Sequence, residues 1–318
     1  MKLAVLSDIH GNDIAFEACL SYLKQQDIDA YCLLGDYIGE LPGIRHTMEM
    51  LYRLMEEECC YIIRGNKEEY QLGSLVEEHP KWDAYPSTVG MLRYGKTQLQ
   101  SKDLDFLKRL PISRIVRIEG LPELMLCHGS PRNVREDLYA HNEKNGEIFK
   151  EIKQTYILSG HTHRSTSFEE HGKLVFNPGA VGLPVHGAKG AQIMILHGDR
   201  GSWVPEFLTI DYAVEDVIRE MHQKHLYEIA PYWTRITEWM LRGADSSHGS
   251  LLAQAMELCT RKYGRSTKGS WLRRIYQYSF ISSRASSSDK ERLFLIRSSV
   301  FSKLQPRSLQ LLMRAWIT

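Results

Sequence analysis

Polar residues able to bind metal ions recur after short apolar runs in the first half of the chain. They stand in the segments "SDIHGN", "GDY", "RGNKEE", "CHG" and "GHTH". The candidate ligands are two carboxylates, one amide and four imidazoles, namely Asp8, His10, Asp36, Asn66, His128, His161 and His163. Such a set suits two adjacent divalent transition-metal ions about 3.5–4 Å apart, with one carboxylate bridging them. The residue types therefore predict a dinuclear metal centre.

The spacing within two of these segments supports a shared site. In D-x-H and H-x-H the two polar residues are at positions i and i+2, which point the same way at the end of an extended strand. Each segment alone has a simpler explanation, because G-D and G-N are common in turns and a single histidine is often structural. Their joint occurrence, each after an apolar run, favours the metal centre.

Strand and helix patterns alternate over the first third of the chain. Apolar runs at 3–8, 29–36 and 60–66 predict strands, and helical spacing of apolar residues predicts helices at 15–25 and 44–58. This alternation is typical of a mostly parallel sheet covered by helices. Because the carboxyl ends of parallel strands face one crevice, we expect the candidate ligands to meet there.

The pattern changes from Ile112 onward. Six short strands are predicted there, in the segments "ISRIVRI", "PELMLCHG", "TYILSGH", "GKLVFNPG", "AQIMILHG" and "SWVPEFLTI". They predict a second, mixed or antiparallel sheet packed on the first, with helices outside. Helical patterns then run from Tyr212 to about Tyr263, including "LLAQAMELCTRKY". We therefore expect an α/β domain at 1–211, a helical extension at 212–263 and a tail at 264–318.

Composition limits the class of protein. The chain has 318 residues, of which 43% are hydrophobic and 25% charged, values that are ordinary for a globular protein. Residues 261–318 carry 13 Lys and Arg against 2 Asp and Glu, so a basic, Ser/Arg-rich tail follows an acidic body. The six cysteines form no C-x-x-C pair, and no run reaches the roughly 18 apolar residues of a membrane span. We expect a cytoplasmic protein without a membrane partner.

Taken in order, the polar segments resemble the D-x-H, G-D, G-N-H-D/E, H and G-H-x-H blocks of calcineurin-like metallophosphoesterases, over about residues 1 to 210. The resemblance implies a four-layer αββα sandwich with two mixed sheets. It implies one ion held by Asp8, His10, Asp36 and His163. It implies a second ion held by Asp36, Asn66, His128 and His161. The segment "NPGAVGLP" at 177–184 is similar to a loop of small bacterial and archaeal members.

The same resemblance implies an activity. It is metal-dependent hydrolysis of a small phosphomonoester, phosphodiester or nucleotide by attack of a metal-bridging hydroxide, with Asp36 and Asn66 in the catalytic set. The two ions would be manganese, iron, zinc or nickel, with manganese favoured. Two alternatives stay open: a catalytically silent metal-binding scaffold, and a phosphodiesterase that acts on nucleic acid through the basic tail.

One position departs from the family pattern. Lys67 stands where many members have a histidine that donates a proton to the leaving group. As a cation beside the metals it could stabilise developing negative charge as a member of the catalytic set, or it could simply point to solvent. Asn12 and Arg64 are candidate substrate-binding residues, with a helix cap and a surface cation as their alternatives.

Deleting residues 264–318 is expected to leave folding and phosphoesterase activity intact, because every proposed ligand lies before Phe168. Circular dichroism and hydrolysis of p-nitrophenyl esters by the truncated chain check this. A truncated protein that is soluble and folded but inactive would place the tail in the active site.

Overall fold

The computed structural model describes residues 1–73, 86–245 and 247–249, so the predicted helix at 251–263 and the basic tail lie outside the described residues. The strands are β1 (Lys2–Leu6), β2 (Ala30–Leu33), β3 (Cys60–Ile62), β4 (Ser113–Val116), β5 (Leu124–Cys127), β6 (Tyr156–Leu158), β7 (Ser165–Glu170), β8 (Lys173–Pro178), β9 (Ala191–Asp199) and β10 (Ser202–Ile210). The helices are α1 (Asp13–Leu23), α2 (Ile44–Glu57), α3 (Asn66–Leu72), α4 (Pro86–Gln98), α5 (Ser101–Arg109), α6 (Asn145–Lys150), α7 (Val214–Gln223), α8 (Leu226–Ile229) and α9 (Pro231–Leu241).

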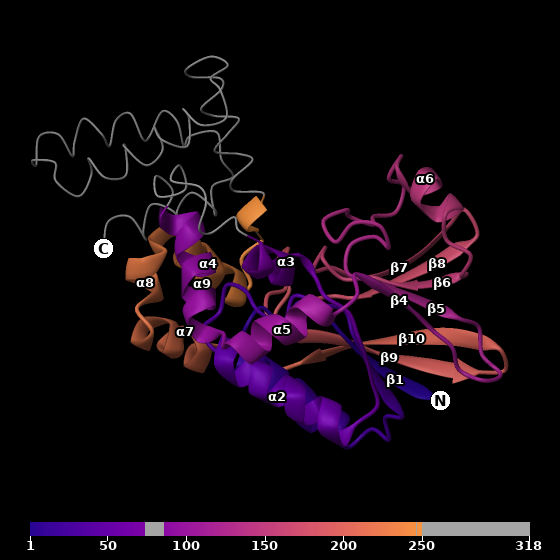
Figure 1. The fold of residues 1–318 in the computed structure, drawn as a ribbon, viewed down its shortest axis with the longest axis horizontal. Coiled ribbons are helices and arrows are strands. Elements are labelled where there is room, and N and C mark those ends of the chain that lie inside the picture. Colours follow the sequence, from indigo (N-terminus) through magenta and orange to yellow (C-terminus); the bar gives the residue numbers. More distant parts are fainter. Residues whose placement is uncertain (74–85, 246, 250–318) are drawn as a thin grey trace, which may run out of the picture. The chain divides into compact units, whose positions relative to one another are not determined.

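The strands form two five-stranded mixed sheets, as the sequence predicts (Figure 1). The first sheet has the order β10-β9-β1-β2-β3, and the second has the order β4-β5-β6-β8-β7. In the first sheet β1, β2 and β3 run parallel, and in the second β5, β6 and β8 run parallel. Both sheets can therefore present several carboxyl strand ends at one edge.

The assignment of all six later strands to the second sheet is wrong. β9 pairs antiparallel with β1, with Leu3 opposite Leu196, and β10 continues from β9, so both strands extend the first sheet. The edge strand β7 was not predicted. Its sequence "STSFEE" is mostly polar, and it forms as the antiparallel partner of β8.

Alternation along β1 separates the layers. Leu3 and Val5 face the apolar cluster between the sheets, whereas Ala4 and Leu6 face the helices. On the outer face of the second sheet, Phe149 of α6 packs in a cluster with residues of β5, β6 and β8. The αββα order is thus confirmed, with the six-residue helix α6 in the outermost layer.

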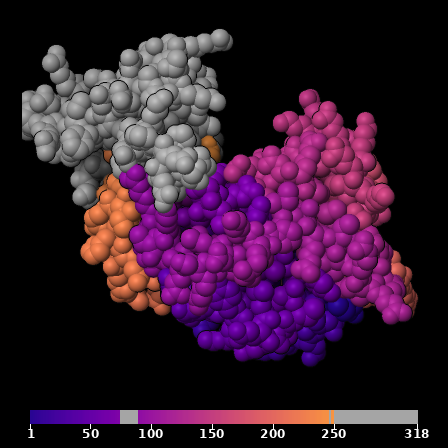
Figure 2. Space-filling view, viewed as in Figure 1, coloured from indigo at the N-terminus to yellow at the C-terminus, as the bar shows by residue number. Residues whose placement is uncertain are grey.

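Helices α7, α8 and α9 add to the helical layer on the first sheet. Met221, Leu226 and Leu241 are buried in the same core cluster as Phe16 of α1 and Leu51 of α2. Figure 2 shows these helices, in orange, on the opposite side of the molecule from the pink strands of the second sheet. The predicted division of the chain at residue 211 stays a prediction.

Across the described ranges, the structure contains no helix with the length and hydropathy needed to cross a membrane.

The loop after β8 ties the two sheets together beside the strand ends. The Val181 N–H donates to the Ser7 carbonyl at 3.0 Å, and the Gly182 N–H donates to the Asp8 carbonyl at 2.9 Å. A Cβ atom on Gly182 would lie 1.8 Å from the Ile9 carbonyl oxygen. Only glycine therefore permits this close approach of two backbones.

Replacing Gly182 by alanine is expected to lower the free energy of unfolding by about 1–3 kcal/mol, because a backbone segment must move to admit the methyl group. Urea denaturation in a chelating buffer measures this without a contribution from metal binding. Gly146→Ala in α6 is the control, since its new Cβ would meet only the His171 ring at 3.5 Å. Equal losses for the two variants would contradict the steric argument.

Candidate metal centre

Each predicted ligand follows one of the parallel strands of the first or the second sheet. Asp8 and His10 follow β1, Asp36 follows β2, and Asn66 begins α3 after β3. His128 follows β5, and both His161 and His163 follow β6. Five strands from two sheets therefore direct these residues to one edge, although the residues are up to 155 positions apart in the chain.

Three of these residues form a first cluster of ligand atoms. Asp8 Oδ1 lies 3.2 Å from His163 Nε2 and 3.6 Å from His10 Nε2. The two imidazole Nε2 atoms are 3.0 Å apart. Asp8 and His10 are buried, and His163 is partly exposed. Atoms this close are able to share one cation, so Asp8, His10 and His163 form a candidate metal-binding group.

A second cluster lies beside the first. His128 Nε2 is 3.0 Å from Asn66 Oδ1, 3.4 Å from Asp36 Oδ2 and 3.9 Å from Asp8 Oδ1. Asp36 Oδ2 is also 3.7 Å from His10 Nε2. Asp8 Oδ1 lies near histidines of both clusters, and Asp36 Oδ2 likewise lies near one histidine of each. Both carboxylates thus stand between the two clusters, and the bridging role of Asp36 stays a prediction.

His161 is placed differently from the other six residues. Its ring centroid lies 5.1 Å from that of His128, but its Nε2 lies 3.5 Å from Asp137 Oδ1. Its backbone N–H donates to Asp8 Oδ2 at 3.0 Å. His161 therefore borders the second cluster, with its Nε2 near a carboxylate outside the predicted set.

The imidazoles are oriented through their other ring nitrogen. Nδ1 of His128 lies 2.8 Å from the Leu34 carbonyl oxygen, and Nδ1 of His163 lies 2.6 Å from the Leu183 carbonyl oxygen. Nδ1 of His10 lies 2.6 Å from Glu40 Oε2. Such partners hold the Nδ1 proton and turn Nε2 toward the centre, as is usual for metal-binding histidines.

The donor set also fits divalent cations by its charge. Asp8 Oδ1 is buried and has no hydrogen-bond partner. Burial raises the pKa of the Asp8 and Asp36 carboxyls, but the neighbouring imidazoles outweigh it and hold both pKa values below the ordinary range. Burial lowers the pKa of His128, but Asp36 and Asp8 raise it overall to about 9. A buried pair of carboxylates thus attracts positive charge to this point.

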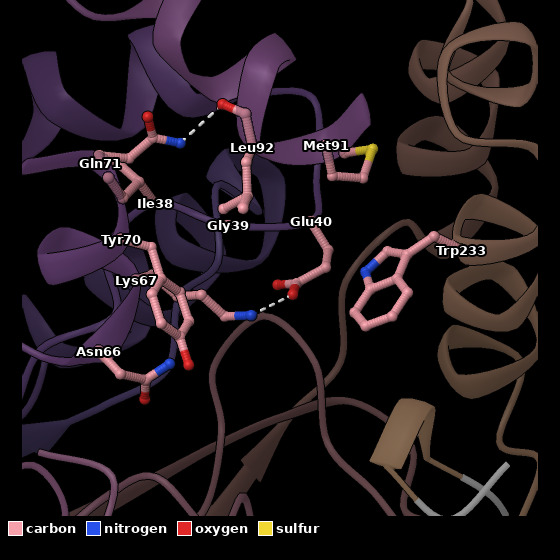
Figure 3. Close-up of a pocket in the computed structure, with 10 residues that line it drawn as sticks. All are labelled: Ile38, Gly39, Glu40, Asn66, Lys67, Tyr70, Gln71, Met91, Leu92 and Trp233. Atoms are coloured by element: carbon pink, nitrogen blue, oxygen red, sulfur yellow. Dashed lines mark hydrogen bonds and ion pairs between the residues drawn. The ribbon is translucent and has the colours of Figure 1, made fainter. Parts of the chain in front are cut away.

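Lys67 does not point to solvent. Its ammonium group forms an ion pair with Glu40, the same carboxylate that orients His10 (Figure 3). Its backbone N–H donates to Asp36 Oδ1 at 2.7 Å, which leaves Asp36 Oδ2 facing the histidines. Of the two glutamates next to Lys67 in sequence, Glu69 lies near Arg135, and Glu68 binds backbone amides.

Glu68 joins the loop after β2 to the loop after β3. Its carboxylate accepts hydrogen bonds from the N–H groups of Asp36 at 2.8 Å, Tyr37 at 2.8 Å and Gly65 at 2.7 Å. The side chain is fully buried. Since Gly65 precedes Asn66, this carboxylate fixes the relative position of two predicted ligands.

Asn12 and Arg64 have their polar groups engaged in other contacts. Asn12 caps α1 by accepting from the Ala15 N–H, and its amide donates to the Gly182 carbonyl at 2.9 Å. It is fully buried, and its substrate-binding role stays a prediction. Arg64 donates to the Lys108 carbonyl at 3.2 Å and pairs with Glu69, so its substrate role stays a prediction.

Sequence reasoning missed three acidic residues at the centre. They are Glu40, Glu68 and Asp137. Glu40 left a usable signal, because it is a lone charge in the apolar and glycine-rich segment "YIGELPG". Glu68 sits in "NKEEY" beside Glu69, and nothing in that segment distinguishes the buried carboxylate from the partly exposed one.

Comparisons with known proteins agree with this geometry. Residues 1–201 match the Calcineurin-like phosphoesterase superfamily domain. An uncharacterized protein of Methanocaldococcus jannaschii is 24% identical over 241 residues, which are 71% of this chain and 94% of that protein.

Two crystal structures are similar to this chain. The metallophosphoesterase of Sphaerobacter thermophilus is 26% identical with a TM-score of 0.57, over 74% of this chain and 98% of the other. A hypothetical protein of Pyrococcus horikoshii shares the fold at 20% identity with a TM-score of 0.64, over 73% and 97%. The family match covers more than half of the chain and contains every residue of both clusters. The chain therefore belongs to the calcineurin-like phosphoesterase superfamily.

Proposed function

We propose that this protein hydrolyses a small phosphorylated molecule, a phosphomonoester, phosphodiester or nucleotide, at a centre of two divalent ions. The observation that carries the proposal is the position of Asp36, whose Oδ2 lies within 3.7 Å of His10 Nε2 in one cluster and within 3.4 Å of His128 Nε2 in the other. The family match and the likeness to the metallophosphoesterase of Sphaerobacter thermophilus support it.

Two ligand groups are proposed to hold the ions. Asp8, His10, Asp36 and His163 would hold one ion, and Asp36, Asn66, His128 and His161 would hold the other. When bound, divalent ions supply Lewis acidity, which neutralises phosphate charge and acidifies water at neutral pH. We propose manganese as the metal. We propose the cytoplasm as the compartment, in keeping with the buried free thiols of Cys19, Cys32 and Cys127.

Lys67 and Glu40 orient two of the proposed ligands. Lys67 holds Asp36 through its N–H group, and its ammonium group positions Glu40, which in turn orients His10. We propose that Lys67 acts by positioning these ligands rather than by donating a proton, because its ammonium group is engaged by a carboxylate. The leaving oxygen then departs without a dedicated proton donor at this position.

Replacing Asp36 by asparagine is expected to lower kcat/KM at least about 10³-fold, because the bridging charge contributes several kcal/mol to transition-state stabilisation. Metal content per chain should fall as well, as measured by elemental analysis of the same sample. Asp199→Asn is the matched control, since that carboxylate is 80% exposed at the end of β9. A variant that keeps two metals and normal turnover would disprove the bridging assignment. Metal-loaded protein without turnover on any ester would favour the scaffold alternative.

The rate is expected to depend steeply on the leaving group. Aryl esters and phosphoanhydrides should be cleaved faster than alkyl esters such as phosphoserine, by roughly the 10²–10⁴-fold that general acid catalysis usually contributes. The test is kcat/KM across phosphoesters of graded leaving-group pKa for the wild type, Lys67→His and Lys67→Ala. If alkyl and aryl esters react equally fast in the wild type, another group donates the proton, and the proposal that the leaving oxygen departs without a dedicated donor fails.

A further inference from the structure

A cavity of about 290 Å³ adjoins the metal centre. It is lined by α3, α4, α9 and the loop that follows Asp36, through Ile38, Gly39, Glu40, Asn66, Lys67, Tyr70, Gln71, Met91, Leu92 and Trp233 (Figure 3). Asn66 belongs to both the cavity wall and the second ligand cluster, since its Oδ1 lies 3.0 Å from His128 Nε2. A molecule with its phosphate at the centre can therefore extend into this cavity.

The walls of the cavity are mostly apolar, and two of them carry aromatic rings. Trp233 is stacked on His248, with ring centroids 4.2 Å apart and an interplanar angle of 14°. The Tyr70 ring has the Arg135 guanidinium 5.0 Å from its centroid. Each ring thus packs against a neighbouring side chain. Met91 adds a flexible apolar side chain that adapts to the shape of a ligand.

The charges in the cavity wall compensate each other. Among the ten residues that line it, Lys67 and Glu40 carry the charges, and they form an ion pair with one another. Glu40 also binds His10 through its other oxygen. A strongly charged ligand would therefore find its possible partners already paired, whereas a flat apolar group would meet two aromatic rings and aliphatic side chains. The lining amide of Gln71 has an unpaired Oε1 that could accept one hydrogen bond from such a group.

We infer that this cavity is the subsite for an aromatic ring in the organic part of the substrate, so that the substrate is an aryl or nucleoside phosphoester. The inference rests on the proposed function and adds the substrate class. Its volume is at the lower end of the roughly 300–1,000 Å³ found for small-ligand pockets, which suits one ring system rather than a large molecule.

The kinetic test keeps the leaving group constant. The manganese-loaded full chain is given the methyl, phenyl and thymidine-5′ diesters of p-nitrophenyl phosphate, and kcat/KM is measured for p-nitrophenolate release. The phenyl and thymidine esters are expected to react at least about tenfold faster than the methyl ester. If the thymidine ester reacts faster than the phenyl ester, the cavity favours a nucleoside. If the phenyl ester reacts faster than the thymidine ester, the cavity favours a simple aryl group. Equal rates for all three esters show that the second ester group does not enter the cavity, and equal binding of the two phosphonates described below then overturns the inference.

Substitutions of Trp233 and Tyr70 test whether the cavity causes the preference for the phenyl ester over the methyl ester. Trp233→Leu and Tyr70→Leu should each lower the phenyl-to-methyl ratio several-fold, and Trp233→Phe should restore much of it. Phe207→Leu is the matched control, because this ring is 37% exposed on β10 and does not line the cavity. If Trp233→Leu does not fold, Tyr70→Leu alone decides. An unchanged ratio in the folded ring variants rejects the cavity as the subsite.

A binding measurement separates this inference from the proposed function. Calorimetry with the manganese-loaded chain should show phenylphosphonate binding at least about tenfold more tightly than methylphosphonate, with the difference reduced in Tyr70→Leu. If no ester is hydrolysed but this difference is found, the proposed hydrolysis fails and the aromatic subsite stands. If esters are hydrolysed but the two phosphonates bind equally, the aromatic subsite fails and the hydrolysis stands.

Discussion

Burial of charged ligands is the constraint on which the site depends. Asp8, His10, Asp36 and His128 are each 1% exposed or less. An isolated buried charge costs many kcal/mol unless it is paired and hydrogen-bonded, so these groups compensate each other and take further partners from the backbone. The loops after the strands therefore have two tasks. They bring the ligands together, and they supply the N–H and carbonyl groups that make the burial tolerable.

The backbone of these loops is strained where the ligands stand. Asp8, His10, Asp36, His161 and His163 all have positive φ angles, between 53° and 67°. This left-handed conformation is unfavourable for residues other than glycine, and it persists only where the surrounding structure enforces it. Hydrogen bonds from the loop after β8 to Ser7 and Asp8 provide part of that support. In this conformation the side chains that follow β1, β2 and β6 face the same site.

A chain of contacts links the metal centre to the neighbouring cavity. Lys67 contacts Glu40, Glu40 contacts His10, and the backbone of Lys67 holds Asp36. The same lysine and glutamate line the cavity, where Tyr70 and Trp233 form the aromatic walls. A histidine at position 67 would lack the length of lysine. Lys67, which stands where many family members have a histidine, therefore both orients proposed ligands and forms part of the wall of the proposed substrate subsite.

The sequence alone determined the fold class and indicated which residues gather at one edge, because both follow from local patterns. An apolar run predicts a strand. Where polar residues directly follow several parallel strands, they are predicted to meet at the same edge of the sheet. Asp8, His10, Asp36, Asn66, His128 and His163 were predicted to meet in this way, and the structure brings them together. Their role as ligands stays a prediction. The tertiary structure decided which sheet β9 and β10 join, since an antiparallel pairing with β1 depends on contacts almost 200 residues apart. It also decided that Lys67 pairs with Glu40 and that Asn12 caps a helix, because a side chain's partner is set by the packing of distant segments, which local sequence does not encode.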